Sequence, residues 1–424
     1  MGKQTIISAL DVGSSSIKML VAKKKKKEHG FELLSQKKVP SSGVRRGVVV
    51  DVEKVGGIIS SLKREIEEEI GQRIDEVFAN IGGSHLFAVP SRGLVSVSRA
   101  DQKISEEDVK RVLQASRTIS LSSNKEIIDV FPRNFIVDGE GGIKEPVGMH
   151  GVRLEADVLA LCGFSPYVRN SHQAILGAGF QSAVLVPTPL ASASAVLTPR
   201  EKELGVCVLD IGAGTTSFAV FEEDNLLHAA VFPVGSASIT NDLAICLKID
   251  VDIAERIKTE FGTCVSSIAL KQKKIVKKKG KSKTKEEKIK IPSSSLKEND
   301  FPEESDIVFS KNKLKKVITA RVIEIFNLAK KELKNISKQK SLPAGVVLTG
   351  GGAKMPGIRD LAKKQFELPC RIGVPLLSSN SREDLDLSVV YGLLTLAQDS
   401  EEDSGGTGGG IFRKIKKIFK VFIP

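Results

Sequence analysis

The chain has 424 residues, 41% of them hydrophobic and 27% charged, and a formal net charge of +13. This composition is typical of a folded protein with two or more domains. The sequence contains no run of about 18 apolar residues, so no membrane-spanning helix is predicted. The five cysteines are dispersed without CxxC spacing and the N-terminus has no signal-peptide pattern, so we expect reduced thiols in a cytoplasmic protein.

The positive charge is concentrated in two segments. Residues 271–290 contain eleven lysines against two glutamates, and the last fourteen residues contain five basic side chains and no acidic one. The rest of the chain is nearly neutral, so we expect no basic domain face that binds nucleic acid. The lysine-rich segment also lacks the aromatic side chains that stack on single-stranded bases.

The first distinctive phrase, DVGSSSIK at 11–18, lies between apolar, strand-like runs at 5–10 and 17–22. Glycine and serine let backbone N–H groups converge on an anion without bulky side chains in the way. The phrase predicts a phosphate-binding hairpin. Asp11 is placed to hold Mg²⁺ through water, because hard cations take oxygen ligands.

The next part of the chain predicts two kinds of structure. Apolar residues at helical spacing predict a helix at 51–70, and a strand follows at 77–81. Residues 85–163 have a different pattern, in which short predicted strands surround a helix at 106–117. Ser105 and Asp108 can cap this helix. We interpret the segment as an inserted subdomain. The elements expected after it are a helix at 171–179, a strand at 183–186 and a small-residue helix at 191–197.

Two further glycine-rich phrases follow. DIGAGTT at 210–216 again lies between apolar runs, so two hairpins about two hundred residues apart indicate one triphosphate held between duplicated lobes, with Asp210 as the second acid beside Mg²⁺.

VVLTGGGAKMPGI at 346–358 predicts a buried strand, a bare loop and a helix start. Its three glycines allow a flat base and ribose to approach the main chain. The Walker A and Rossmann patterns are absent.

The C-terminal half also contains low-complexity sequence. Residues 266–304 are lysine- and serine-rich, and we expect a disordered surface loop. The loop is either a second membrane contact, a nucleic-acid contact or merely solvated, and we favour the last. Helices are predicted from 240, at 251–261 and at 317–336, and the acidic, glycine-rich segment 399–410 predicts a flexible tether.

The last residues, IFRKIKKIFKVFIP at 411–424, predict an amphipathic helix. Its apolar stripe consists of Ile411, Phe412, Ile415, Ile418, Phe419 and Phe422, and its cations are Arg413, Lys414, Lys416, Lys417 and Lys420. The alternatives are docking on the chain's own core, against which the tether argues, and docking on a protein partner, against which the cations argue. An anionic membrane surface fits this pattern best.

With these features together, the chain resembles the FtsA family of actin-like bacterial cell division proteins. Two phosphate hairpins followed by an adenosine loop is the order of the actin, Hsp70 and sugar-kinase superfamily, and PSSGVRRGVVVD at 40–51 and EPVGMHGVRLE at 145–155 resemble FtsA in particular. The resemblance covers nearly the whole chain apart from the lysine-rich loop. It implies an α/β fold of two actin-like, ribonuclease-H-like lobes with an inserted α+β subdomain and a C-terminal amphipathic helix.

The resemblance also implies boundaries for these parts. They are 1–84 and 164–198 for the core of lobe I, 85–163 for the inserted subdomain, 199–235 and 305–398 for the core of lobe II, 236–304 for a nucleotide-covering subdomain that contains the loop 266–304, 399–410 for the tether and 411–424 for the membrane helix.

The same resemblance implies the roles of individual residues. Asp11 and Asp210 would hold Mg²⁺ through water. The β- and γ-phosphates would be contacted by Gly13, Ser14, Ser15, Ser16, Lys18, Gly212, Gly214, Thr215 and Thr216. The adenosine would be lined by Gly350, Gly351, Gly352 and Met355, with Glu255 and Lys258 facing ribose and base. The alternative for Glu255 and Lys258 is a solvated pair on a helix.

The function implied is that of an ATP-binding protein that self-associates on the cytoplasmic face of the membrane at the division septum. It would bind anionic lipids, FtsZ and other division proteins. Thr188 stands before Pro189 where an acid can orient the attacking water, so we expect slow or absent hydrolysis. Ser217 stands where members of the family frequently have an acidic residue, and Gly235-Ser236 stands where they usually have two glycines. These differences also put ATP turnover in doubt.

Three other functions compete with this one. A small-molecule kinase of the superfamily needs a catalytic aspartate beside a sugar pocket, and no such motif is found. A chaperone-like ATPase needs a substrate-binding domain after the core, where only a tether and a short helix follow. A pilus-assembly actin homologue is the nearest alternative, and the basic tail argues against it.

Overall fold

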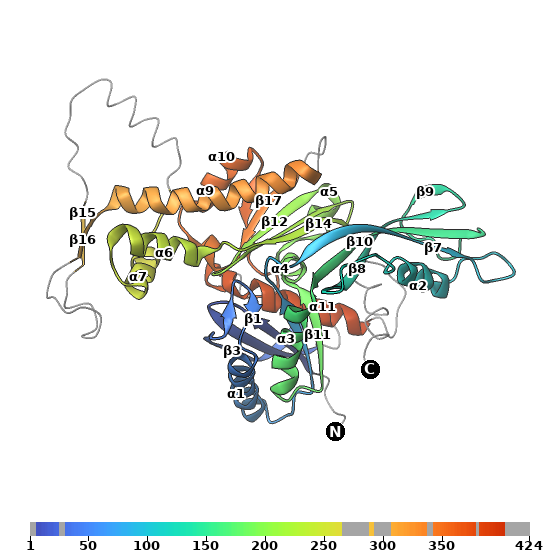
Figure 1. The fold of residues 1–424 in the computed structure, drawn as a ribbon, viewed down its shortest axis with the longest axis horizontal. Helices are drawn as coiled ribbons and strands as arrows, with labels where there is room; N and C mark the ends of the chain where they lie inside the picture. The colour runs from blue at the N-terminus through green and yellow to red at the C-terminus, as the bar shows by residue number, and fades with distance from the viewer. Residues whose placement is uncertain are drawn as a thin grey trace, which may run out of the picture.

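The computed structural model describes residues 6–24, 30–264, 288–291, 307–336, 342–378 and 381–402. These residues form two α/β lobes and a smaller unit that projects from them, at the right of Figure 1. The predicted membrane helix at 411–424, most of the predicted tether and most of the lysine-rich loop lie outside the described residues. None of the described helices combines the length and apolar content needed to cross a bilayer.

Lobe I is built on a five-stranded sheet of order β11-β6-β1-β2-β3. Its strands are β1 (Ile6–Val12), β2 (Ser16–Lys24), β3 (Phe31–Pro40), β6 (Glu76–Ile81) and β11 (Ser182–Pro187). The first three are antiparallel, whereas β6 and β11 join in parallel. Most of β1 and β2 is buried, as expected for apolar strands in a sheet covered on both faces.

Lobe II repeats this strand order as β14-β13-β12-β17-β18. Its strands are β12 (Val206–Ile211), β13 (Thr216–Glu222), β14 (Asn225–Phe232), β17 (Gly345–Thr349) and β18 (Cys370–Ile372). Three antiparallel strands are again followed by two that join in parallel. The predicted duplication of the lobes is therefore confirmed.

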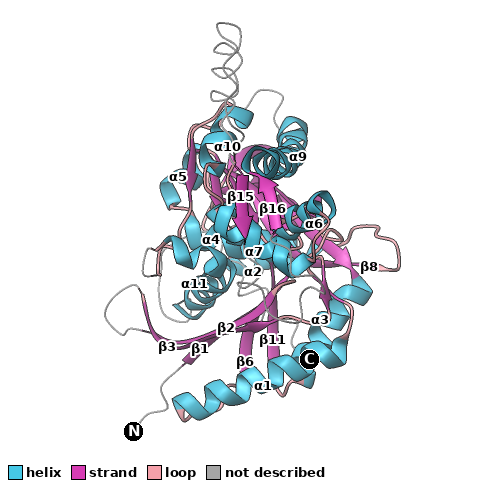
Figure 2. Cartoon of the chain, turned by 90° about the vertical axis from the view of Figure 1, so that its left-hand side faces the viewer, coloured by secondary structure: helices cyan, strands magenta, loops and turns pink. Residues whose placement is uncertain are grey.

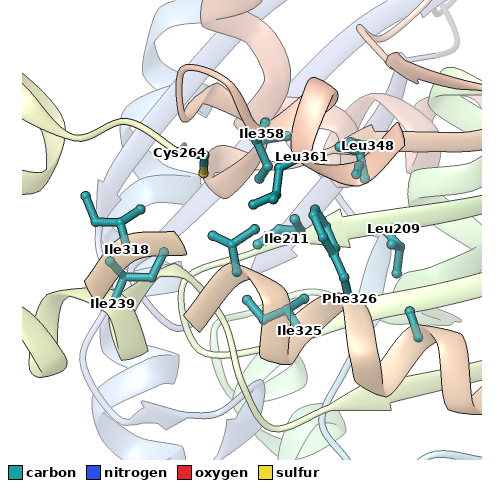
Figure 3. Packing of buried hydrophobic residues seen from close by; sticks show 14 of the residues in the cluster. Leu209, Ile211, Ile239, Cys264, Ile318, Ile325, Phe326, Leu348, Ile358 and Leu361 are labelled. Atoms are coloured by element: carbon teal, nitrogen blue, oxygen red, sulfur yellow. The ribbon is translucent and has the colours of Figure 1, made fainter. Parts of the chain in front are cut away.

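Helices cover the outer faces of both sheets. In lobe I these are α1 (Val52–Ile70), which runs along the lower face of the sheet in Figure 2, and α3 (Ser165–Gly177). In lobe II, α9 (Lys311–Ile336) and α10 (Ile358–Phe366) pack on the sheet, whereas α6 (Ser236–Leu247) packs on α9 and α7 (Val251–Phe261) packs on α6. Phe326 of α9 lies in the middle of the lobe II core, between Leu209 of β12 and Leu361 of α10 (Figure 3).

Two helices fill the space between the lobes: α4 (Thr188–Val196) and α11 (Ser388–Glu402). Small residues dominate α4, which lets the two helices approach closely. A Cβ atom at Gly392 of α11 would lie 1.7 Å from the carbonyl oxygen of Ala191, so glycine is required there. Although α11 follows lobe II in the sequence, it also packs on β1, β2 and β6 of lobe I.

The inserted unit has a four-stranded sheet of order β7-β10-β8-β9 with one helix. Its elements are β7 (Phe87–Ser96), α2 (Glu106–Ala115), β8 (Lys125–Val137), β9 (Glu140–Ile143) and β10 (Arg153–Phe164). The predicted capping pair is confirmed, because Ser105 and Asp108 form a capping box at the start of α2. Arg133 ties the unit to lobe II by donating to the carbonyls of Leu226 and Leu227 on β14.

Short elements complete the described chain. They are β4 (Val44–Arg45), β5 (Val48–Val49), α5 (Pro199–Leu204), β15 (Lys288–Ile291), β16 (Ile307–Ser310), η2 (Gly351–Lys354) and η3 (Arg382–Leu387), the last two being 3₁₀ helices.

Several predicted boundaries were wrong. The helix predicted at 171–179 is α3 and begins at Ser165, and the helix predicted from 240 is α6 and begins at Ser236. Residues 288–291 lie within the segment predicted to be disordered but form β15, because the alternation Lys-Ile-Lys-Ile suits a strand that pairs with β16. Residues 399–402 were assigned to the tether but continue α11, since the glycine-rich sequence begins only at 405. Helix α9 begins six residues before the predicted 317, because the apolar pattern extends back to the buried Leu314.

Candidate functional site

A cavity of about 530 Å³ lies between the lobes where the β1–β2 and β12–β13 turns face each other. All of the predicted cofactor-binding residues except Thr216 line it, as does Thr188. They are Asp11, Gly13, Ser14, Ser15, Ser16, Lys18, Asp210, Gly212, Gly214, Thr215, Glu255, Lys258, Gly350, Gly351, Gly352 and Met355. The topology thus brings together residues that are more than three hundred positions apart in the sequence.

Thr216 does not line this cavity. Its side chain is fully buried, and its hydroxyl donates to the carbonyl oxygen of Val234 at 2.8 Å. Side chains alternate across a strand, and Ser217 is the residue of β13 that pairs with Asp210 and lines the cavity. The cavity-facing side chain of β13 is therefore that of Ser217, one residue after the predicted Thr216.

The carboxylates at the two strand ends lie in a buried, charged environment. Lys18 pairs across the β1–β2 ladder with Asp11, and its Nζ lies 2.7 Å from Asp11 Oδ2. Burial alone would lower the pKa of Lys18, but the charge and hydrogen bond of Asp11 outweigh it, so this pKa is raised. Burial, together with the charge of Asp11, raises the pKa of Asp210 to about 7 although Lys18 acts in the opposite direction.

The first hairpin is held in place by neighbours outside it. The N–H of Val12 donates to Oδ1 of Asn80 at the end of β6, at 2.7 Å. Oγ of Ser14 accepts from the N–H of Gly47 at 2.8 Å, which joins the hairpin to the turn between β4 and β5. Within the turn, the N–H of Gly13 donates to the carbonyl of Ser16 at 3.2 Å.

The second hairpin is held from the side by the start of α6. The N–H groups of Ser236 and Ala237 donate to the carbonyls of Gly212 and Ala213 at 2.8 and 2.9 Å. A Cβ atom at Gly235 would lie 2.4 Å from the Ala213 carbonyl oxygen, so a glycine is needed immediately before α6. Ser236 has no such constraint and lines the cavity instead.

The third loop, which follows β17 and contains Gly350, Gly351 and Gly352, requires glycine at two of these three positions. At Gly350, where φ is +83°, a Cβ atom would lie 2.2 Å from Oδ1 of Asp210, and at Gly352 it would lie 2.4 Å from Cγ2 of Ile211. Both positions therefore require glycine for the loop to pack on β12. At Gly351 a Cβ atom would meet only Cβ of Asp386 at 3.5 Å, an ordinary contact.

The predicted pair on α7 closes the cavity from the lobe II side. Nζ of Lys258 lies 2.6 Å from Oε2 of Glu255 and 2.9 Å from Oγ1 of Thr240 on α6. Lys258 is only 7% exposed, so it is not a solvated helix residue, whereas the side chain of Glu255 is half-exposed. Residue 262, just after α7, packs on the third loop, since a Cβ atom there would lie 3.1 Å from Sδ of Met355.

The hydroxyl of Thr188 is engaged with lobe I. It donates to the carbonyl oxygen of Ile81 at 2.9 Å and accepts from Nδ2 of Asn80 at 3.3 Å. Asn80 therefore connects the first hairpin to the start of α4 through its two side-chain atoms. The predicted water-orienting position thus carries a neutral side chain whose proton is already donated.

Several cavity residues were missed by sequence reasoning: Lys38, Asn80, Lys354, Asp386 and Ser388. Lys38 pairs across the β2–β3 ladder with Lys18, a relation that only the strand register reveals. The ionisable residues that line the cavity are then balanced in charge: Lys18, Lys38, Lys258 and Lys354 against Asp11, Asp210, Glu255 and Asp386.

Two lobes of identical strand order, with a cavity at their paired hairpins and a small unit inserted in the first, define an actin-like protein. The model of the family "Cell division protein FtsA" matches residues 207–392, and that of the "SHS2 domain inserted in FTSA" matches 83–162, the span from just before β7 to near the end of β10. The chain belongs to the FtsA family of cell division proteins.

Individual relatives support this membership over most of the chain. The cell division protein FtsA of Pseudomonas aeruginosa is 33% identical over 373 residues, which cover 87% of this chain and 83% of that protein. The cell division protein FtsA of Borreliella burgdorferi is 32% identical over 418 residues, which cover 98% of this chain and 94% of that protein. The predicted family is therefore confirmed.

Solved structures show the same fold at lower identity. A PilM-PilN type IV pilus biogenesis complex matches with a TM-score of 0.61 at 18% identity, covering 93% of this chain and 99% of that chain. MreB5 of Spiroplasma citri, bound to ADP, matches with a TM-score of 0.53 at 13% identity, covering 94% and 98%. The likeness to the pilus protein concerns the fold alone, and the family models do not favour that alternative.

Proposed function

We propose that this chain binds ATP with Mg²⁺, self-associates on the cytoplasmic face of the cell membrane and anchors the FtsZ ring through its last fourteen residues. The observation that carries the nucleotide part is the convergence of three glycine-containing loops on one cavity between the lobes. Their residues have the composition that phosphates and a base require, namely backbone N–H groups with little side-chain bulk.

The cavity's polar groups fit such a ligand. Ser388 lines the cavity, and its buried hydroxyl has no hydrogen-bond partner within the described part of the chain, so it is free to bond to a ligand or its water once the side chain turns into the cavity. Burial and then the charge of Asp11 raise the pKa of Asp210, although Lys18 opposes them. An added divalent cation would favour the ionised form of Asp210.

Magnesium would be shared between protein and nucleotide. No cluster of three or more potential metal-ligating side chains occurs among the described residues. Asp11 and Asp210 would therefore hold a hydrated Mg²⁺ whose remaining ligands are phosphate oxygens, and this cation would offset part of the negative charge of the triphosphate. The ADP bound to MreB5 of Spiroplasma citri supports the assignment by analogy of fold.

The membrane part of the proposal rests on the sequence of the tail. Six apolar side chains and five cations, spaced in the sequence as on an amphipathic helix, suit the boundary between lipid headgroups and acyl chains. FtsZ, further copies of this chain and other division proteins are the partners that membership of the FtsA family suggests, and the septum is the corresponding location. ATP hydrolysis is slow, because Thr188 offers no base.

Equilibrium binding of ATP tests the nucleotide assignment. We expect binding that EDTA weakens and that Ser15→Asp abolishes, because Ser15 is exposed at the first hairpin and a carboxylate there repels phosphate. Ser42→Asp adds the same charge at an exposed position that does not line the cavity and serves as the matched control. Binding that Ser15→Asp leaves unchanged contradicts the assignment.

A further inference from the structure

Asp386 joins the two lobes at the wall of the cavity. Its Oδ2 accepts from Nζ of Lys38 on β3 of lobe I at 2.6 Å, and its Oδ1 accepts from Nζ of Lys354 in the third loop of lobe II, also at 2.6 Å. Lys354 additionally donates to the carbonyl of Glu383 at 2.7 Å. One carboxylate therefore holds a lysine from each side of the cavity.

The backbone around Asp386 places it at the junction of the lobes. Leu385 is buried in the core of lobe II, whereas Leu387 is buried in the cluster between the lobes. The N–H of Gly350 donates to the carbonyl of Leu385 at 3.1 Å, so η3 is fastened to the third loop. The Lys38–Asp386 pair is therefore a direct contact between β3 of lobe I and η3, which is fastened to lobe II.

We propose that Asp386 is a positioning residue that latches the lobes together, so that its carboxylate, by holding Lys38 and Lys354, slows opening of the cavity and release of its ligand. The inference rests on the proposed nucleotide function for the identity of that ligand. It assigns to this ion-pair triad a role that neither the glycine loops nor the phosphate hairpins supply.

The electrostatics agree with a maintained contact. Burial raises the pKa of Asp386, but the hydrogen bonds from Lys354 and Lys38 outweigh this and hold it at about 2. The Asp386 side chain is 18% exposed, whereas those of Lys38 and Lys354 are 52% and 41% exposed. Ion pairs of half-exposed lysines are individually weak, so the latch tunes the rate of opening and does not lock the lobes.

The test compares four variants by the dissociation rate of a fluorescent ATP analogue. We expect Asp386→Asn, which keeps the shape of the side chain, to raise this rate about fivefold, as the loss of two modest ion pairs implies. Lys38→Met should raise it by less, and Lys38→Met with Asp386→Asn no more than Asp386→Asn alone. Additive effects would mean that Lys38 contacts the ligand directly and would overturn the latch.

Lys37→Met is the matched control. Lys37 is the neighbour of Lys38 on β3, but its ion pairs are with Glu65 and Glu69 of α1, inside lobe I. Its loss should leave the dissociation rate unchanged.

Amide hydrogen exchange of the nucleotide-free protein separates failure of the latch from failure of the proposed function. Asp386→Asn should accelerate exchange of the Gly350 amide and of η3, and Lys37→Met should not. Faster exchange in a protein that binds no nucleotide would refute the proposed function and support the latch. Unchanged exchange and unchanged dissociation in Asp386→Asn would overturn the latch.

Discussion

The hydroxyl of Thr188 donates a hydrogen bond to the carbonyl oxygen of Ile81 at 2.9 Å. Because this hydroxyl is neutral and its proton is engaged, it cannot accept a proton from an attacking water. A missing general base costs about 10²–10⁴-fold in rate. We therefore expect ATP hydrolysis barely above background, measured as phosphate release under single-turnover conditions.

A carboxylate at the same position should restore part of the rate. Thr188→Glu is expected to accelerate phosphate release, whereas Thr188→Gln, of similar size but neutral, should not. A brisk wild-type rate that requires Mg²⁺ and vanishes in Asp210→Ala would show that another residue positions the water.

Two variants of Gly351 in the third loop distinguish the effect of added charge from the effect of added bulk. Gly351→Asp is expected to abolish ATP binding, because the carboxylate would project beside Asp386 and repel phosphate. Gly351→Ala should keep the loop intact, since an added Cβ meets only Cβ of Asp386 at 3.5 Å, and should weaken binding less than Gly351→Asp does. Calorimetry measures both affinities, and equal losses in the two variants would show that steric bulk, not charge, explains the effect.

The apolar stripe of the tail should carry membrane affinity. Phe412→Glu with Phe419→Glu removes burial of about 2 kcal/mol per side chain and adds repulsion from anionic lipid. We expect loss of binding to vesicles, and high salt should weaken wild-type binding through screening. Ser404→Glu with Thr407→Glu adds the same charge within 399–410 and should retain more affinity; equal losses would locate the effect in net charge alone.

The inserted unit should carry a pH-dependent contribution to stability. Burial raises the pKa of Asp129 to about 7, although Arg117 lowers it. The raised pKa disfavours the ionised carboxylate in the folded state, so this contribution is complete below about pH 4 and is lost as the pH rises towards 7, by at most about 1.4 kcal/mol per pH unit. It remains lost at higher pH.

Asp129→Asn removes this titration and keeps Oδ1, the atom that accepts from both the N–H of Val130 and Arg117. Urea unfolding between pH 4 and 8 should show the variant gaining stability relative to wild type as the pH rises. A constant difference between the two proteins across this range would contradict the assigned pKa.

The glycine loops were predictable because their requirement is local. Gly350 and Gly352 leave no room for a side chain wherever such a loop packs on its strand, and glycine marks this need in the sequence itself. The duplicated lobes followed from two hairpins with the same order of apolar runs. The capping pair of α2 was predictable for the same reason, since it depends on residues three positions apart.

The missed features depend on distant pairings. Thr216 was misplaced because the parity of β13 is set by its pairing with β12, and Lys38 was overlooked because its position follows from the β2–β3 register. No local sequence pattern marks Asp386, because its contacts with Lys38 and Lys354 form only when the fold places η3 between the lobes. In 288–291 a strand pattern was hidden by the lysine-rich composition around it.

Co-sedimentation with vesicles of phosphatidylglycerol and phosphatidylethanolamine tests the central claim most directly. The full chain is compared with a truncation to residues 1–402, which retains all of α11, each with and without ATP and Mg²⁺. We expect the full chain to pellet with the vesicles and the truncated chain to stay in the supernatant, while both bind ATP with equal affinity. Pelleting of the truncated chain to the same extent as the full chain would contradict the account.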